Sequence, residues 1–170
     1  MKRNVLSKLI DWKNKKNRKP LILNGARQVG KTYILREFGS QCYEKMAYVN
    51  CDKNKMLEKI FSQDYNISRI LLSLSAILHV NIEPGNTLII FDEIQESPTV
   101  LNSLKYFCED APQYHVAVAG SLLGISLHNN TSFPVGKVDM IKMYPMTFDE
   151  FLMAIGEQPL VDILATKDFS

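Results

Sequence analysis

Three short apolar runs, each ending at glycine or polar residues, limit the folds available to this chain more than any other feature. They cover residues 21–23, 87–91 and 115–119, and segments with helical periodicity separate them. An uninterrupted β-branched and aromatic run is typical of a strand that is covered on both faces. Parallel strands are joined by helical crossovers that cover the sheet. The sequence therefore predicts an α/β protein of three layers, in which a parallel sheet lies between helices.

Periodicity and capping residues predict the remaining elements. Ser97 is the N-cap and Pro98 the first residue of a helix that extends to about Asp110. Thr147 and Glu150 form a capping box at the start of a later helix. We also expect helices over residues 31–38, 54–61 and 67–79, a strand over 46–51 and an edge strand over 137–144.

The loops that follow the three apolar runs are the candidate binding loops. Ligands of parallel sheets bind at the carboxyl ends of the strands. We therefore expect the loops at 24–31, 92–96 and 120–124 to meet in one crevice.

Length and composition exclude several classes of protein. The 170 residues suit one domain or slightly more, and a hydrophobic fraction of 46% is that of a globular chain. The longest apolar stretch, residues 67–80, has 14 residues and contains Arg69, whereas a membrane span needs ~20. The start of the chain also lacks the apolar region of a secretory signal. We expect a cytoplasmic protein without a membrane partner.

Cysteine and histidine positions give no metal or disulfide pattern. The three cysteines lie at 42, 51 and 108, and the three histidines lie at 79, 115 and 128. This spacing contains neither a CxxC pair nor a histidine pair one helical turn apart. We interpret the cysteines as core thiols and predict no metal site made of these residues.

Positive charge is concentrated at the start of the chain. Residues 1–31 contain ten Lys and Arg and one acid, a net charge of +9, whereas the rest contains ten Lys and Arg and 17 acids, a net of −7. Val5, Leu9 and Trp12 have helical spacing, which predicts a basic amphipathic helix within residues 1–19. Two interpretations stay open. The helix contacts DNA or another anionic surface, or it packs its apolar stripe on the body and leaves its lysines in water.

The sequence Gly-x4-Gly-Lys-Thr lies between the first apolar run and the helix that follows it. In such a loop successive backbone N–H groups point inward and the helix N-terminus adds its dipole, so the loop favours a bound phosphate. Lys31 would contact the β- and γ-phosphates of a nucleotide, and the Thr32 hydroxyl would bind Mg²⁺. The predicted nucleotide-binding residues are Gly25, Ala26, Arg27, Gln28, Val29, Gly30, Lys31 and Thr32. Because no Asn-Lys-x-Asp motif for guanine follows, we expect ATP.

Asp92 and Glu93 directly follow the second apolar run. A carboxylate at the end of a buried strand is costly to desolvate unless it has a partner. Asp92 is suited to bind Mg²⁺, and Glu93 is suited to accept a proton from an attacking water. Ser121 follows the third run and has two open interpretations. It could orient the water and sense the γ-phosphate as part of catalysis, or it could cap a short helix after it.

The sequence resembles the N-terminal AAA+ ATPase module of a widespread prokaryotic ATPase family in four blocks. These blocks are residues 19–38, 91–95, 119–121 and 144–151. Its members typically continue into a nuclease-like C-terminal domain of unknown function. The resemblance implies a P-loop NTPase fold with a five-stranded sheet in the order 5-1-4-3-2. It also implies that Glu93 is the catalytic glutamate, that Ser121 is in the sensor position and that residues 20–156 are the ATPase core.

Two departures from the AAA+ pattern affect the expected activity. AAA+ modules usually close a helical lid over the nucleotide, whereas residues 157–170 would only begin a truncated C-terminal region, so we expect a fragment of a longer protein. After the loop the sequence contains only Arg36 and Arg69 as arginines, and neither is on an obvious finger loop. Arg27 could contact phosphate or stay in solvent. Because an arginine finger contributes roughly 10³ to 10⁵ in rate, we expect ATP binding with slow turnover.

Two classes of function follow. In the first, ATP hydrolysis drives a conformational change in the C-terminal partner domain or in DNA bound to it. In the second, the chain is a nucleotide-dependent switch with negligible turnover. A homo-oligomer is a further candidate partner. A small-molecule kinase would need an arginine-bearing lid and an acceptor site, which the sequence does not indicate.

Overall fold

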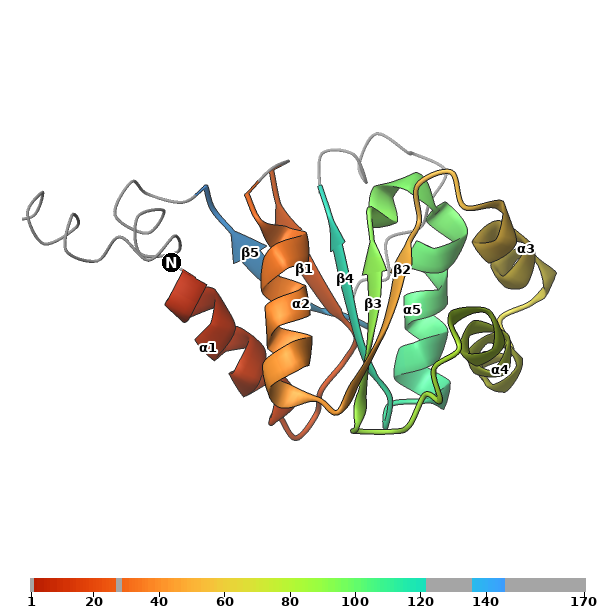
Figure 1. Cartoon of the computed structure of the whole chain (residues 1–170), viewed down its shortest axis with the longest axis horizontal. Helices are drawn as coiled ribbons and strands as arrows, with labels where there is room; N and C mark the ends of the chain where they lie inside the picture. Colours follow the sequence, from red (N-terminus) through yellow and green to blue (C-terminus); the bar gives the residue numbers. More distant parts are fainter. Residues whose placement is uncertain (1, 27–28, 122–135, 146–170) are drawn as a thin grey trace, which may run out of the picture.

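The computed structural model describes residues 2–26, 29–121 and 136–145 (Figure 1). The described part contains a parallel sheet of five strands in the order β2-β3-β4-β1-β5. The strands are β1 (Leu21–Gly25), β2 (Lys45–Asn50), β3 (Thr87–Asp92), β4 (His115–Gly120) and β5 (Asp139–Met143). The order 5-1-4-3-2 that the resemblance implied is therefore confirmed.

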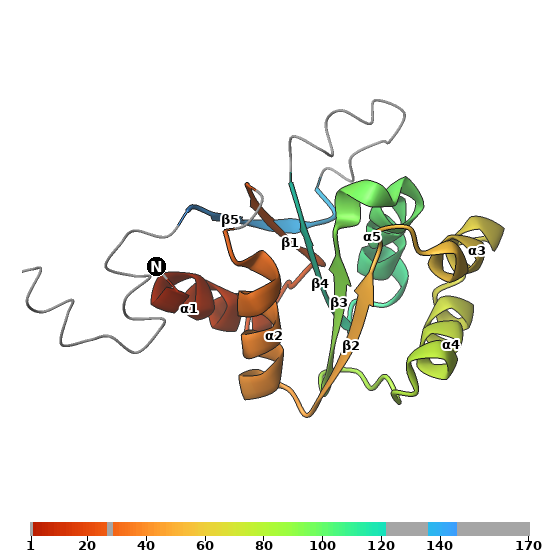
Figure 2. The same ribbon diagram turned by 45° about the horizontal axis from the view of Figure 1, so that its top comes forward.

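Helices cover both faces of this sheet (Figures 1 and 2). They are α1 (Lys2–Lys13), α2 (Lys31–Cys42), α3 (Lys55–Gln63), α4 (Ile67–Leu78), the short 3₁₀ helix η1 (Ile94–Glu96) and α5 (Pro98–Asp110). The first two helices pack on one face, and α3, α4 and α5 pack on the other. The three-layer α/β architecture is thus confirmed.

The central strands are buried on both faces because helices lie on each side. All six residues of β3 are buried. Leu88 and Ile90 contact the α1 and α2 layer, whereas Ile89 and Phe91 contact the α3 to α5 layer. Successive side chains of a strand point to opposite faces, so the middle of a strand that is covered on both faces is apolar without alternation, as residues 88–91 are. This requirement explains the uninterrupted apolar run in the sequence.

The apolar stripe of α1 packs on the body of the protein. Val5, Leu9 and Trp12 are buried, and the indole of Trp12 is only 4% exposed. Its Nε1 donates a hydrogen bond to the carbonyl oxygen of Lys19 at 2.8 Å, and its ring meets the Phe38 ring edge to face. The expected packing of the apolar stripe on the body is confirmed. Trp12 is therefore not available to stack on a base, while a contact between the lysines and DNA stays a prediction.

Several expected boundaries shift by a few residues. The helix expected over 31–38 continues to Cys42, and Gly39 within it faces the Met46 side chain of β2 at a distance that leaves no room for a Cβ. The edge strand expected over 137–144 is shorter, at Asp139–Met143. The Ser97 cap is confirmed, since its side chain accepts a hydrogen bond from the Val100 amide.

The other predictions on segments and cysteines have mixed outcomes. The capping box at Thr147 and Glu150 and the region 157–170 lie outside the described residues. Cys51 is a buried core thiol as expected, whereas Cys42 and Cys108 are only half-buried. Within the described ranges, no helix is both long and apolar enough to cross a membrane.

Candidate functional site

The glycine loop connects β1 to α2 at the carboxyl edge of the sheet. Gly25 ends β1, and a Cβ there would lie 2.6 Å from the Met143 carbonyl oxygen of β5, so a larger residue would push the two strands apart. Gly30 is the N-cap of α2 with φ of 91°, a conformation that L side chains rarely adopt. Among the residues that the structure describes, no side chain caps this helix start through a hydrogen bond.

Lys31 is the first residue of α2, and its ammonium lies against the loop backbone. The Nζ atom donates hydrogen bonds to the carbonyl oxygens of Gly25 at 2.6 Å and Ala26 at 2.8 Å. The positive charge is therefore held at the loop by groups of the loop itself. The contact of this ammonium with a bound phosphate stays a prediction.

Thr32 and Asp92 meet across the site, although they are 60 positions apart. The Thr32 hydroxyl donates a hydrogen bond to Asp92 Oδ2 at 2.6 Å. Asp92 ends β3 and is only 5% exposed. A hydroxyl and a carboxylate side by side are the oxygen ligands that Mg²⁺ takes in phosphate sites. The two residues predicted to bind the metal are thus brought together.

Tyr48 of β2 is a third partner in this cluster. Its hydroxyl donates to the same Asp92 Oδ2 at 2.6 Å. Partial burial, followed by the hydrogen bond to Asp92, raises the pKa of Tyr48 to about 12. The phenol is therefore a permanent donor near neutral pH. The guanidinium of Arg36 lies 3.9 Å from the centre of the Tyr48 ring and fixes it from the other side.

Tyr48 lies outside every motif that the sequence analysis identified. It precedes Asp92 by 44 residues and reaches it only because β2 pairs with β3 in register. Nothing local in the sequence marks it as a partner of that acid. The one available signal is that a tyrosine near the carboxyl end of a strand next to β3 has the length to reach its last residue.

Glu93 leaves the strand in an unusual backbone conformation. Its φ is 53°, in the left-handed region that few residues other than glycine adopt. Its amide donates to Asp92 Oδ1 at 2.9 Å. Its carboxylate accepts a hydrogen bond from the Gln95 side chain at 2.5 Å. The candidate base is therefore tied to the end of β3 and to η1. The sequence analysis assigned no role to Gln95, although it belongs to one of the resembling blocks.

The remaining predicted site residues are Ala26, Arg27, Gln28, Val29 and Ser121. Val29 is buried in the core beside α2, and Ala26 is exposed. Ser121 directly follows β4, which lies between β1 and β3, so all three loops start from neighbouring strands. Its two interpretations stay open, because the residues after it lie outside the described part. Arg27 and Gln28 also lie outside it.

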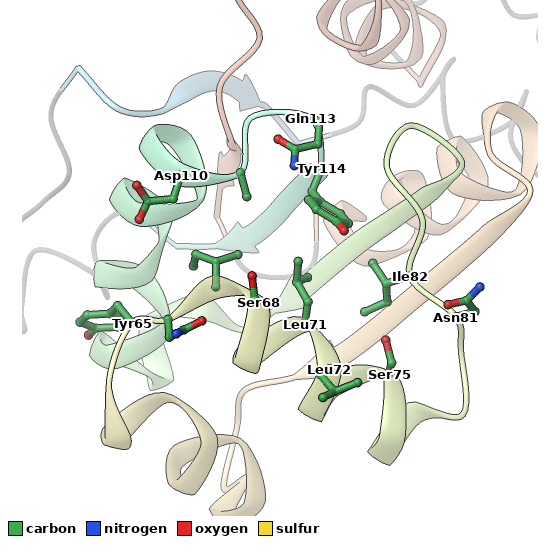
Figure 3. A pocket seen from close by; sticks show the side chains of 13 residues that line it. Tyr65, Ser68, Leu71, Leu72, Ser75, Asn81, Ile82, Asp110, Gln113 and Tyr114 are labelled. Atoms are coloured by element: carbon green, nitrogen blue, oxygen red, sulfur yellow. The ribbon is translucent and has the colours of Figure 1, made fainter.

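A pocket of about 600 Å³ lies away from this cluster (Figure 3). It is lined by α4, by the end of α5 and by the segments before β3 and β4, including Leu71, Ile82 and Tyr114. Those segments precede the strands, so the pocket lies at the amino ends of the strands, whereas Lys31 and Asp92 lie at their carboxyl ends. None of the predicted site residues lines it.

The fold and the cluster together define a class of protein. A parallel sheet in this order, flanked by helices on both faces and with a glycine loop leading into α2, is a P-loop NTPase-like fold. The family model for the AAA domain matches residues 17–152. The chain belongs to this family. A search of curated proteins gives no significant match.

Proposed function

We propose that the chain binds ATP with Mg²⁺ at the loop of residues 25–32 and hydrolyses it. The amides of the loop and the start of α2 bind the phosphates, and Lys31 contacts the β- and γ-phosphates. Thr32 and Asp92 hold Mg²⁺, which neutralises phosphate charge when it is bound. The single observation that best supports this proposal is the 2.6 Å contact between Thr32 Oγ1 and Asp92 Oδ2, which joins the loop to the acid of β3.

Glu93 is the proposed general base. It takes a proton from the attacking water as the water oxygen bonds to the γ-phosphorus and the bond to the β-phosphate oxygen breaks. Ser121 is proposed to orient the water from the end of β4. Its position after a strand adjacent to β3 supports this role.

Hydrolysis is proposed to drive a conformational change in a C-terminal partner domain beyond the ATPase core of residues 20–156, with DNA as a candidate substrate of that domain. The basic segment of residues 1–19 is a candidate contact for DNA, and a second copy of the chain is a candidate partner.

One observation favours the alternative, a nucleotide-dependent switch with negligible turnover. Arg36 and Arg69, the arginines that follow the loop, are both engaged elsewhere. Arg36 stacks on Tyr48. Arg69 pairs with Asp64 at 3.0 Å and donates to the Ile60 carbonyl oxygen. Neither is positioned as a finger, so the isolated chain is proposed to turn ATP over slowly.

The test of the loop measures binding of Mg²⁺-ATP to Lys31→Ala by calorimetry. The variant should bind at least 100-fold more weakly than wild type because it lacks the charge that contacts the phosphates. It should still fold, since the lost hydrogen bonds end on loop carbonyls. Lys55→Ala is the matched control, because Lys55 is also the first residue of a helix and is exposed. Wild-type affinity in Lys31→Ala would exclude this loop as the binding site.

The test of the mechanism compares binding and turnover in Glu93→Gln. The amide keeps the size of the side chain but cannot accept the proton, so affinity should stay and hydrolysis should be lost. Hydrolysis at the wild-type rate would refute the role of Glu93. If the full-length protein keeps its biological activity with this variant, the switch is the correct function.

A further inference from the structure

The side chain of Gln95 makes a contact that packing alone does not require. Gln95 lies in η1 and is 5% exposed. Its Nε2 donates to Glu93 Oε2 at 2.5 Å. A carboxylate has no hydrogen to donate, so the NH₂ group of the amide must face it and the amide oxygen must face away. The contact therefore fixes the orientation of both side chains.

The amide oxygen of Gln95 is the second feature of this side chain. Among the residues that the structure describes, Gln95 Oε1 is buried and accepts no hydrogen bond. It lies against Gly120 at the end of β4, where a Cβ would approach it to 2.8 Å and would approach Ile94 Cγ2 to 2.4 Å. A buried acceptor without a donor destabilises the fold relative to an apolar side chain of the same shape. Methionine would fill this space without that penalty.

A second unfavourable feature lies two residues away. Glu93 has the left-handed φ of 53° that a residue with a Cβ adopts only under constraint. Strained backbone and unsatisfied buried polar groups concentrate at functional sites, where another requirement outweighs stability. Here both features serve the same contact, since they set the Glu93 carboxylate against the Gln95 amide.

We propose that Gln95 is a positioning residue that holds the Glu93 carboxylate in a single orientation for proton transfer. Gly120 lacks a side chain so that the amide can lie against the end of β4. The inference rests on the proposed role of Glu93 as general base. It adds that the base depends on a buried amide from the following 3₁₀ helix.

The test replaces the amide with an apolar side chain of similar size in Gln95→Met. Single-turnover hydrolysis of Mg²⁺-ATP by the 170-residue chain should slow by roughly 10- to 100-fold, because a misplaced group loses this much in rate. The Kd for ATP should stay within about twofold, since the hydrogen bond of the amide among the described residues goes to Glu93 and not to the loop. The Tm should be unchanged or higher, because the unsatisfied oxygen is removed.

The matched control is Gln41→Met. Gln41 forms the same kind of amide–carboxylate pair, with Glu37 at 3.1 Å, but it is exposed and far along α2. This variant should keep the wild-type rate. In the Glu93→Gln background, Gln95→Met should have no further effect on the rate, because the group that it positions is already disabled.

Three results would overturn the proposal for Gln95 alone: a wild-type rate in Gln95→Met, a loss of rate matched by a loss of ATP affinity, or a full additional loss in the Glu93→Gln background. Failure of the proposed function looks different. The proposed function fails if Glu93→Gln hydrolyses ATP at the wild-type rate, or if the wild-type chain does not hydrolyse ATP. Either result overturns both proposals.

Discussion

His115 should make the stability of this protein depend on pH in a mildly acidic range. It is the first residue of β4 and is 6% exposed. Its Nδ1 lies 2.6 Å from the Tyr43 hydroxyl, and the Trp12 ring of α1 meets its ring edge to face. Burial, together with the positive charges of Arg18 and Lys13, lowers the pKa of His115 from 6.5 to about 4. The folded protein therefore resists protonation of this ring.

The sign of the effect follows from proton linkage. Between pH 6.5 and pH 4 the unfolded chain binds a proton at His115 that the folded chain does not, so the free energy of unfolding falls as the pH falls through this window. With these two pKa values, the loss relative to pH 7 is roughly 1 kcal/mol at pH 5.5 and roughly 2 kcal/mol at pH 4.5. Above pH 7 the contribution is constant.

The measurement is urea unfolding of wild type and His115→Asn at pH 7.0, 5.5 and 4.5. Asparagine keeps a hydrogen-bonding group near the Tyr43 hydroxyl but does not titrate. Carboxylates also titrate in this range, so the informative quantity is the difference between the two proteins. Wild type should lose its advantage over the variant as the pH falls. A difference in unfolding free energy that is constant across the three pH values would refute the reasoning.

Two further variants test the site. Tyr48→Phe removes one hydrogen bond to the Asp92 carboxylate, while the hydrogen bond from Thr32 remains. The free energy of unfolding in urea should therefore fall by about 1–2 kcal/mol. The Mg²⁺ concentration for half-maximal turnover should rise several-fold. Unchanged Mg²⁺ dependence would show that Tyr48 does not act on the metal site. Gly25→Ala places a Cβ 2.6 Å from the Met143 carbonyl oxygen, which can move only with its strand. The free energy of unfolding in urea should therefore fall by about 1–3 kcal/mol, and the affinity for ATP should fall as well. Wild-type stability in this variant would mean that β1 and β5 separate without penalty.

The parts of the fold that the sequence predicts are those set by local chemistry. The buried strands can be predicted because the middle of a strand covered on both faces is a continuous apolar run, as residues 88–91 of β3 show. The start of α5 is visible because Ser97 caps it. The glycine loop and Asp92 can be predicted from the sequence. In each case a characteristic residue type, glycine or aspartate, stands directly at the end of an apolar run that predicts a strand. The strand order, in contrast, came from the resemblance, since spacing alone allows several orders.

The residues that the sequence does not reveal act through tertiary contacts. Tyr48 reaches Asp92 because β2 pairs with β3. The Gln95 amide reaches Glu93 because Glu93, with its left-handed φ, is the residue from which η1 begins. Neither contact has a fixed spacing that a motif could record. Both supply hydrogen bonds to the two acids that the motif does record. A motif thus identifies the groups that are proposed to contact the ligand better than it identifies the groups that hold them in place.

The positive charge at the start of the chain also has partners that only the tertiary structure reveals. Its net charge favours a contact with an anionic partner, yet several of its cations have partners within the protein. Lys13 donates to the backbone at the end of α2 and lies over the Tyr43 ring. Lys15 pairs with Asp139 of β5 at 2.9 Å, and Arg18 donates to backbone carbonyls, one of them in the segment before β4. Surface pairs of this kind contribute little to stability one by one. Together they connect the end of α1 and the residues after it to the end of α2, to β5 and to the segment before β4, so the positive charge serves in part to attach this segment to the rest of the fold.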